Sequence, residues 1–254
     1  MPLTGTRDLT AIAGSAPLLT SLDTDPWELK GAQHLQLHYE LGGDRQALLP
    51  PALHPSIPPT LLVNVTHVPD SEVGAFNLAT VRVGCRAGAR PRGLLVRGYC
   101  DSAAATSVLR ERWGYPIDLA DVWFKPGYAR AATSVTVDGE VVLEGELVDP
   151  QPITGADVQY MASLNLARVS RDGEEKALLL QVDPDFTFER AQRGRPRLKV
   201  FDAEAWNLPG ASAAHPISAS LTTVDITLPS LRYLVHPERD PLGAVERLPQ
   251  PQPA

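Results

Sequence analysis

The sequence "LRERWGYPIDLADVWF", residues 109–124, joins the end of a charged helix to an aromatic turn. The helix end is Arg-Glu-Arg at positions 110–112, and the turn is Trp-Gly-Tyr-Pro at positions 113–116. Glycine and proline stop a helix and fix the path of the chain beyond it. The turn therefore directs the next side chain, Ile117, toward a defined place in the fold, and the other segments must indicate what lies there.

The composition limits what this turn can belong to. The chain has 254 residues, of which 43% are hydrophobic and 21% are charged, as is typical of a globular protein with a substantial core. Its net charge of −7 offers no general attraction to nucleic acid or anionic membranes. No stretch approaches the roughly 18 apolar residues of a membrane span, and the N-terminal residues lack the pattern of a secretory signal. We expect a cytoplasmic protein with no nucleic-acid or membrane partner, in which Cys85 and Cys100 are buried thiols.

Most of the chain has the pattern of β-strands. Alternating or β-rich runs, bounded by Gly, Pro, Asp and Asn, occupy residues 34–41, 60–68, 77–87, 93–100, 132–148, 164–170, 176–183, 186–201 and 218–228. Asp-Gly pairs at 138–139 and 172–173 predict tight hairpins. The clearest helix is residues 102–112, and residues 155–161 predict a short turn. The sequence therefore predicts a mainly β fold, an antiparallel barrel or cone that is closed or half closed, with a pocket for a small molecule.

The ends of the chain differ from its middle. Residues 1–25 and 243–254 are poor in apolar periodicity and rich in Pro, Gly or Ser. We therefore expect an N-terminal arm and a Pro-rich C-terminal tail outside the core, on either side of a single domain at 26–242.

Sequence motifs of common enzymes are absent. The chain has no phosphate-binding loop, no dinucleotide-binding glycine motif, no zinc-protease motif and no hydrolase nucleophile elbow. His34 and His38 lie on one face of a predicted strand beside Glu40, but a metal site would need a further ligand from elsewhere. A row of polar side chains facing solvent is the favoured interpretation, and we expect neither a metal ion nor a cofactor.

Six segments occur in an order that resembles the acetoacetate decarboxylase superfamily. They are "PWELKG" (26–31), "LLPPAL" (48–53), "SEVGAFNLATV" (71–81), "GYCDSAAATSVLRERWGYPIDLA" (98–120), "VFDAEAWNLPG" (200–210) and "DITLPSLRYLV" (225–235). The resemblance covers roughly residues 26–240. It implies a largely antiparallel β-barrel or cone with a buried cavity, usually assembled as an oligomer.

The resemblance also shows a departure at the active-site segment, which in the family reads approximately G-R-E-x-[WY]-G-[FY]-P-K-K. The matching residues here are Arg110, Glu111, Trp113, Gly114, Tyr115 and Pro116. The family's decarboxylases use the first lysine of that motif to form a Schiff base with a β-keto acid, with its pKa lowered by desolvation and a neighbouring cation. This chain has Ile117 and Asp118 at the two lysine positions, so the resemblance implies that the parent chemistry is lost.

Three further positions depart from the family pattern. Leu78 stands where the family's pocket glutamate is expected, and Asn64 stands where another carboxylate tends to occur. Ala32 stands where an arginine would help to hold the carboxylate of the substrate. With Trp113 and Ile117, these residues predict a predominantly apolar cavity that binds a larger molecule by area and shape.

The favoured hypothesis is an enzyme of specialised metabolism that does not decarboxylate. A cavity of this kind could catalyse the cyclisation of a polyketide-like substrate, by cycloaddition or oxa-Michael closure, by holding its ends close to their bonding geometry. Glu111, Tyr115, Asp118 and Asn64 are the candidates for polarising a carbonyl or moving a proton. For Glu111 and Tyr115 a role in the helix-turn scaffold is the alternative, and for Asp118 a role at the surface.

Two other functions remain open. A decarboxylase, aldolase or dehydratase could use a relocated amine, and Lys125 lies closest in sequence to the turn among the four lysines, although it also fits an ordinary exposed lysine before proline. A protein that binds an apolar metabolite without catalysis is the third hypothesis. The sequence does not identify the substrate, the exact reaction or the oligomeric state.

Overall fold

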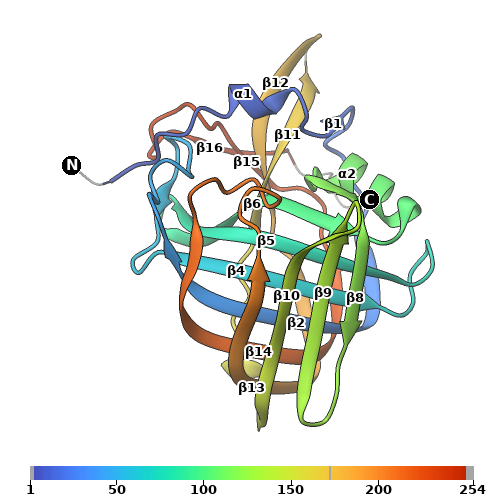
Figure 1. Ribbon diagram of the computed structural model, residues 1–254. Helices are drawn as coiled ribbons and strands as arrows, with labels where there is room; N and C mark the ends of the chain where they lie inside the picture. Colours follow the sequence, from blue (N-terminus) through green and yellow to red (C-terminus); the bar gives the residue numbers. More distant parts are fainter. Residues whose placement is uncertain (1–2, 172, 250–254) are drawn as a thin grey trace.

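The computed structural model describes residues 3–171 and 173–249, and most of them lie in strands (Figure 1). The strands are β1 (Leu18–Leu19), β2 (Trp27–Gly42), β3 (His54–Pro55), β4 (Thr60–Val68), β5 (Phe76–Ala87), β6 (Arg90–Cys100), β7 (Ile117–Leu119), β8 (Asp121–Lys125), β9 (Arg130–Val137), β10 (Glu140–Ile153), β11 (Ser163–Arg171), β12 (Glu174–Val182), β13 (Asp185–Phe201), β14 (Ser212–Leu228), β15 (Tyr233–Val235) and β16 (Val245–Arg247). The helices are α1 (Thr10–Ala13), α2 (Ala103–Trp113) and a short 3-10 helix at Gly155–Asp157. No helix among the described residues is long and apolar enough to span a bilayer.

The strands form one strongly curved sheet. Its hydrogen-bonded order is β16-β15-β12-β11-β6-β5-β4-β2-β14-β13-β10-β9-β8, with β1, β3 and β7 attached to β11, β5 and β6. Neighbours are antiparallel except for the pairs β1–β11, β6–β11 and β6–β7. The two ends of this order, β16 and β8, do not pair within the described residues, so the sheet is not closed. The predicted mainly β, antiparallel fold is confirmed in this open form.

Long, bent strands allow the single sheet to form more than one layer. β2 and β14 pair along most of their length, and their register shifts between Ala213 and His215, Pro216 and Ser218, and Val224 and Ile226. Such bulges bend a strand and increase its twist. Figure 1 shows the result: β8, β9 and β10 run across β2, β4 and β5 at a steep angle.

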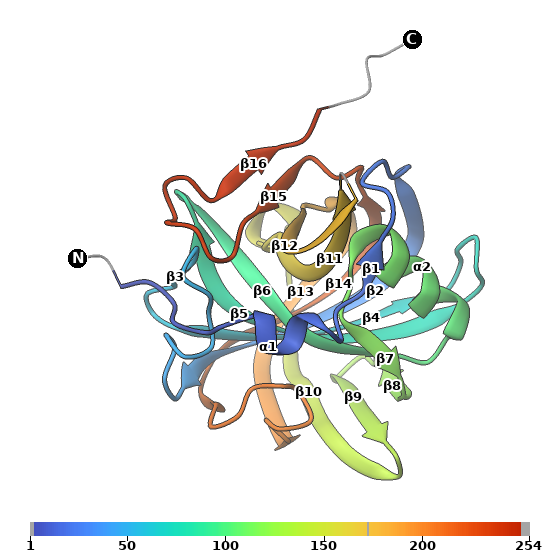
Figure 2. The same ribbon diagram turned by 90° about the horizontal axis from the view of Figure 1, so that it is seen from above.

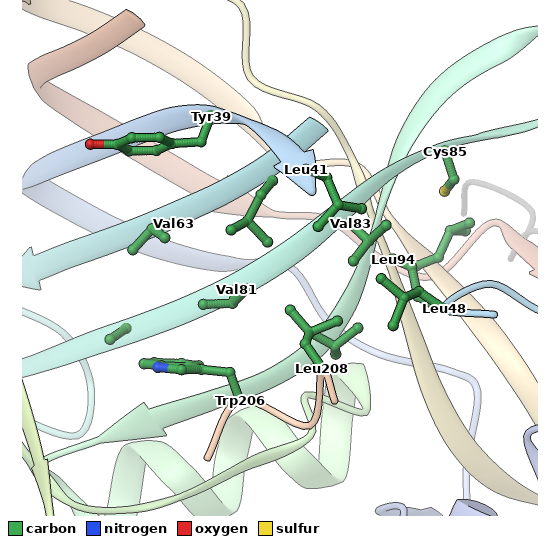
Figure 3. Packing of buried hydrophobic residues seen from close by; sticks show 14 of the residues in the cluster. Tyr39, Leu41, Leu48, Val63, Val81, Val83, Cys85, Leu94, Trp206 and Leu208 are labelled. Atoms are coloured by element: carbon green, nitrogen blue, oxygen red, sulfur yellow. The ribbon is translucent and has the colours of Figure 1, made fainter. Parts of the chain in front are cut away.

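One face of β2, β4 and β5 contributes to a first hydrophobic core. Alternate residues such as Leu37, Val63 and Val81 are fully buried there. Figure 3 shows Val63 and Val81 beside Trp206 and Leu208 from the segment after β13. Because this face is apolar at every second residue, the intervening side chains of the same strands must point to the opposite face.

The opposite face belongs to a second hydrophobic core, which α2, β11 and β12 cover. Figure 2 shows β11 and β12 on one side of β5 and β6, with β9 and β10 on the other. Trp27 stacks on Trp113 with ring centroids 5.9 Å apart and on Phe76 with centroids 6.0 Å apart. The Trp113 Nε1–H donates to the Pro229 carbonyl at 2.8 Å, which fixes the end of α2 to the segment after β14.

Several local predictions are confirmed. Ser102 caps α2, since its Oγ accepts from the Ala105 N–H at 3.3 Å. Asp138 and Gly139 adopt φ values of 50° and 86°, as a tight β9–β10 hairpin requires. β11 and β12 form the second hairpin with Arg171 opposite Glu174, and position 172 lies outside the described residues. Both cysteines are buried and free.

The chain ends were expected to lie outside the core, but several of their described residues are buried. Leu9 and Leu19 are buried, and β1 pairs with β11. Ala244 and Leu248, on either side of β16, are buried too, while residues 250–254 lie outside the described part of the chain. Single apolar residues anchor these segments as they cross the body, and this leaves no periodic pattern in the sequence.

Candidate functional site

The aromatic turn is fixed by a glycine at the end of α2. Gly114 has a φ of 62°, in the left-handed region that favours glycine, and its N–H donates to the Arg110 carbonyl at 3.1 Å. A Cβ at Gly114 would lie 2.8 Å from side-chain carbons of Ala167 and Leu180. The turn therefore packs tightly against β11 and β12, and Trp113 and Tyr115 on either side of Gly114 are buried.

Ile117 is fully buried directly over β6. Its backbone pairs with Gly98, and a Cβ on Gly98 would lie only 2.6 Å from the Ile117 Cγ2 atom. The Arg110 guanidinium donates to the Ile117 carbonyl at 2.7 Å. The isoleucine thus fills the space above a glycine as part of the second core.

A small cavity of about 50 Å³ lies beside this turn, between the sheet and the second core. We call it the inner cavity. Its lining residues are Leu29, His34, Thr66, Val68, Phe76, Leu78, Thr80, Arg82, Leu109, Tyr115, Pro184, Phe186, Ile226 and Leu228. Its apolar wall agrees with the predicted cavity, but the alternate positions of β2, β4 and β5 add a polar wall that the sequence analysis did not predict.

Arg82 on β5 is the cation of the inner cavity. Its Nη1–H donates to the Met161 carbonyl at 3.0 Å, while its Nε is shielded from solvent and has no partner among the described residues. Burial lowers the pKa of this guanidinium, and the neighbouring Tyr115 phenol partly opposes the shift. No carboxylate of the described residues forms an ion pair with Arg82. The cavity therefore contains a positive charge without a protein counter-ion.

Gly93 on β6 gives Arg82 the room to lie along the sheet. A Cβ at Gly93 would be 3.1 Å from the Arg82 Cβ and Cδ atoms, so a larger residue there would displace the side chain. The backbone N–H of Gly93 also donates to the Ala162 carbonyl at 2.9 Å. Position 93 thus ties the arginine to the segment that carries Met161.

His34 on β2 is buried and neutral at physiological pH. Burial and the nearby Arg82 charge lower the pKa of His34 from 6.5 to about 3, against an opposing effect of the Asn64 amide. Its Nδ1 lies 2.8 Å from the Thr66 hydroxyl oxygen, in a hydrogen bond whose direction depends on the tautomer. A neutral imidazole of this kind is a weak base, but it can donate or accept a hydrogen bond.

Tyr115 adds a second polar group next to Arg82. Burial raises the pKa of the Tyr115 phenol, and the Arg82 charge partly opposes this shift. The phenol is therefore protonated near neutral pH and can donate a hydrogen bond. A guanidinium and a hydroxyl donor in a poorly solvated cavity can bind an anion or stabilise negative charge that develops on an oxygen.

The structure brings only some of the predicted site residues to the inner cavity. Leu78 and Tyr115 line it, and Asn64 is buried next to it, where its Oδ1 accepts from the Gln36 Nε2 at 3.0 Å. Ala32, Trp113 and Ile117 are buried in the surrounding second core without lining the cavity. The turn therefore supplies a phenol rather than an isoleucine to the cavity wall.

Glu111 and Asp118, which were predicted to act on a bound substrate, do not line the inner cavity. Both are exposed. Asp118 pairs with Arg97 at 2.7 Å and with Arg110 at 3.6 Å, and Glu111 accepts a hydrogen bond from Ser107. These contacts tie the two carboxylates to the helix and the turn, which fits the scaffold and surface alternatives.

His34 and His38, beside Glu40, were predicted to form a polar row facing solvent, and this is wrong for His34, which is buried. His34 and Gln36 are buried and His38 is half-buried, because this face of β2 lies under the segment between β10 and β11. No group of three potential metal ligands occurs among the described residues. The row is part of the polar wall instead.

None of the lysines contributes to the inner cavity. Lys30, Lys125, Lys176 and Lys199 are the four lysines of the chain, and all four are exposed. Lys199 pairs with Glu144 at 2.9 Å on the outer surface. Lys125, the candidate for a relocated amine, lies on β8 and does not line the cavity.

Comparison with known proteins agrees with this architecture. The family model for acetoacetate decarboxylase matches residues 17–236. The chain belongs to the acetoacetate decarboxylase family. No curated protein sequence matched the chain.

Solved structures show the same fold at low sequence identity. The acetoacetate decarboxylase of Legionella pneumophila has a TM-score of 0.71 at 20% identity, covering 83% of this chain and 88% of its own. The enduracididine biosynthesis enzyme MppR, complexed with the condensation product of pyruvate and imidazole 4-carboxaldehyde, has a TM-score of 0.66 at 16% identity over 84% and 90% of the two chains. An acetoacetate decarboxylase-like enzyme of Sphingomonas wittichii RW1 has a TM-score of 0.64 at 16% identity over 83% and 94%. At these identities the likeness establishes the fold and leaves the chemistry to the residues of this chain.

Proposed function

We propose that this chain is an enzyme that acts on a carbonyl compound without forming a Schiff base. Ile117 occupies the position that matches the family's reactive lysine, and all four lysines of the chain are exposed. The inner cavity therefore offers no amine to attack a carbonyl carbon. Decarboxylation through an imine has no support in this arrangement of residues.

The observation that carries the proposal is Arg82, a cavity cation without a protein counter-ion. Arg82 is half-buried, and leaving a partly buried charge unpaired costs free energy that a bound anion would offset. With the Tyr115 hydroxyl beside it, Arg82 would bind the carbonyl oxygen of a substrate and stabilise it as it becomes an enolate oxygen.

Ring closure by conjugate addition fits these groups best. In this reaction a hydroxyl oxygen of the substrate bonds to the β-carbon of an enone. The π pair of the carbon–carbon double bond shifts to form a double bond between the α-carbon and the carbonyl carbon, and the π pair of the carbonyl group moves to its oxygen, which gives an enolate. The hydroxyl proton finally reaches the α-carbon, so the product is an isomer of the substrate. Arg82 and Tyr115 would stabilise the intermediate enolate, and a cycloaddition would use the same groups to polarise its carbonyl.

The rate enhancement would come from two sources. Removing one donor to a developing oxyanion typically costs about 10²–10³ in rate. Holding the two ends of a flexible substrate in contact can supply up to about 7–11 kcal/mol in the best intramolecular cases. Neither source needs a group that changes protonation near neutral pH, and neither His34 nor Tyr115 changes protonation there.

The test is turnover of linear hydroxy-enones of different chain length by wild type, Arg82→Met and Tyr115→Phe. We expect a cyclic product of unchanged mass, and a loss of about 10²-fold or more in the rate with Arg82→Met. Decarboxylation or dehydration would reveal itself by a lighter product. Arg195→Met is the matched control, since Arg195 is exposed and pairs with Asp149.

A covalent trap tests the missing imine directly. Borohydride with pyruvate or acetoacetate should leave the intact mass of the protein unchanged. A stoichiometric adduct on Lys125 or any other lysine would refute the proposal. Tight binding of hydroxy-enones without any product would instead support a binding protein.

A further inference from the structure

A second, larger cavity lies along the same face of the sheet as the inner cavity. We call it the outer cavity, and its volume is about 410 Å³. Its lining residues are Gln36, His38, Leu62, Ile153, Asp157, Val158, Gln159, Met161, Arg193, Ser218, Ala219 and Ser220. The inner cavity, at about 50 Å³, holds no more than a few water molecules, whereas sites for small molecules measure about 300–1,000 Å³.

Strands β2 and β4 run continuously from one cavity to the other. On β2, His34 lines the inner cavity, and Gln36 and His38 line the outer cavity at the next two positions of the same face. On β4 the same order places Thr66 in the inner cavity and Leu62 in the outer cavity. The two cavities therefore share one floor.

Tyr160 and Met161 lie over that floor. The Tyr160 ring packs edge-on against His34 with centroids 4.6 Å apart, and its hydroxyl lies 2.9 Å from the Thr222 hydroxyl on β14. The next residue, Met161, offers its carbonyl to Arg82 at 3.0 Å. Tyr160 and Met161 thus both contact residues of the inner cavity, and Met161 also lines the outer cavity.

The segment that carries Tyr160 and Met161 is held by internal hydrogen bonds and by contacts with β13. Within it, Asp157 accepts hydrogen bonds from the Thr154 N–H and hydroxyl, which stabilise the segment internally. Arg193 donates to the Asp157 carbonyl at 2.8 Å, and Gly155 packs on Phe188. Between Val158 and Met161, Tyr160 contacts His34 and Thr222, and Met161 contacts Arg82; these three partners are polar groups that a ligand could engage instead. The Tyr160 ring also packs against Phe186 and Phe188 on β13, with centroids 4.9 Å and 5.9 Å apart.

We propose that the outer cavity is a substrate subsite for the oxygenated chain of a molecule whose carbonyl or carboxylate head binds Arg82, and that the chain passes between the cavities where Tyr160 and Met161 now lie. This inference rests on the proposed function, since it extends the site around Arg82. The outer cavity provides amide and hydroxyl groups from Gln36, Ser218 and Ser220, which suit hydroxyl, ether or carbonyl oxygens. Leu62, Ala219 and Met161 provide apolar surface for the carbon atoms between those oxygens.

Two carboxylates of different length test this subsite by calorimetry. Methoxyacetate carries only the head, and methoxyethoxyethoxyacetate carries the same head on a chain of ether oxygens. We expect the long probe to bind wild type at least about tenfold more tightly than methoxyacetate. Decanoate, an apolar chain of similar length, should exceed the affinity of methoxyacetate by a smaller factor. Equal affinity of the long and the short probe would overturn the inference.

Ser218→Phe, which fills the outer cavity, should remove most of the difference in affinity between the long and the short probe. The matched control is Ser212→Phe, an exposed serine at the start of the same strand, which should keep this difference. A difference that persists in a well-folded Ser218→Phe protein would overturn the inference. Tyr160→Phe, which loses the Thr222 hydrogen bond, should speed association of the long probe about two- to tenfold.

The proposed function can fail separately from the subsite. Arg82→Met should weaken both probes, because both carry the carboxylate head. If Arg82→Met changes neither affinity while Ser218→Phe still removes the difference, the head site is wrong and the subsite stands. If Arg82→Met weakens both probes and Ser218→Phe leaves their ratio unchanged, the head site stands and the subsite is wrong.

Discussion

Replacing Arg82 by methionine should abolish anion binding while leaving the protein folded. The substitution removes one charged hydrogen bond, to the Met161 carbonyl, which is worth about 1.5–3 kcal/mol. It also removes an Nε donor that has no partner among the described residues, which costs about 1–3 kcal/mol. These contributions nearly cancel, so we expect the melting temperature of Arg82→Met to stay within about 4 °C of wild type.

The effect on binding should be larger than the effect on folding. If acetate binds wild type with a Kd of about 10 mM, 100 mM acetate adds about 1.4 kcal/mol to the free energy of unfolding. For a chain of this size that raises the melting temperature by roughly 3–5 °C. Thermal melts in acetate, compared with sodium chloride at equal ionic strength, should show this rise in wild type and in Arg195→Met but not in Arg82→Met.

Two results would refute this reasoning. An equal rise in wild type and Arg82→Met would mean that acetate binds elsewhere. A fall of more than about 8 °C in Arg82→Met, without acetate, would mean that the arginine is a structural residue whose hydrogen bond outweighs the cost of burying it.

Substitutions at four other positions separate the cavity from its scaffold. Leu78→Trp should fill the inner cavity and abolish the acetate-dependent rise in melting temperature, in contrast to Leu78→Met, which keeps the volume. Ile117→Lys should lower the melting temperature, because the new charge would be buried over Gly98. This variant should not release carbon dioxide from acetoacetate. Decarboxylation by it would show that a single change restores the parent chemistry. Glu111→Gln and Asp118→Asn should keep the acetate response of wild type and change the free energy of unfolding by at most about 1 kcal/mol, so a lost response in either would place that carboxylate in the site.

The sequence predicted the fold well because the relevant signals are local. Alternating apolar residues marked the strands, the Asp138-Gly139 pair marked a hairpin, and Ser102 and Gly114 bounded α2. The buried ends of the chain were missed, because isolated contacts such as that of Leu19 with the second core depend on tertiary packing rather than on a repeating pattern.

The polar wall of the site was missed for a different physical reason. On β2, β4 and β5, polar residues alternate with apolar ones, which is the usual pattern of a strand with one face in solvent. Here the curved sheet is buried on both faces, so His34, Thr66 and Arg82 point into a cavity instead. The alternation itself was visible at His34-x-Gln36, Asn64-x-Thr66 and Thr80-x-Arg82. A sequence cannot show which face another segment covers, and the segment that covers this one, around Tyr160, is a loop without periodic pattern.

The charge state of the inner cavity can be measured through folding. The pKa of His34 is about 3 in the folded protein and 6.5 for an ordinary histidine, so the unfolded chain binds more protons between these two values. The stability that comes from a neutral His34 is therefore complete above about pH 6.5 and is lost as the pH falls toward 3, with a slope of up to about 1.4 kcal/mol per pH unit.

Urea unfolding between pH 4 and 7 should show a steeper loss for wild type than for His34→Gln, while the exposed-site control His215→Gln should follow wild type. Parallel curves for wild type and His34→Gln would mean that His34 charges easily, and Arg82 would then share the cavity with a second cation. A steeper wild-type curve would leave Arg82 as the one full charge among the lining residues at neutral pH, so that the ligand's own oxygen must supply its partner.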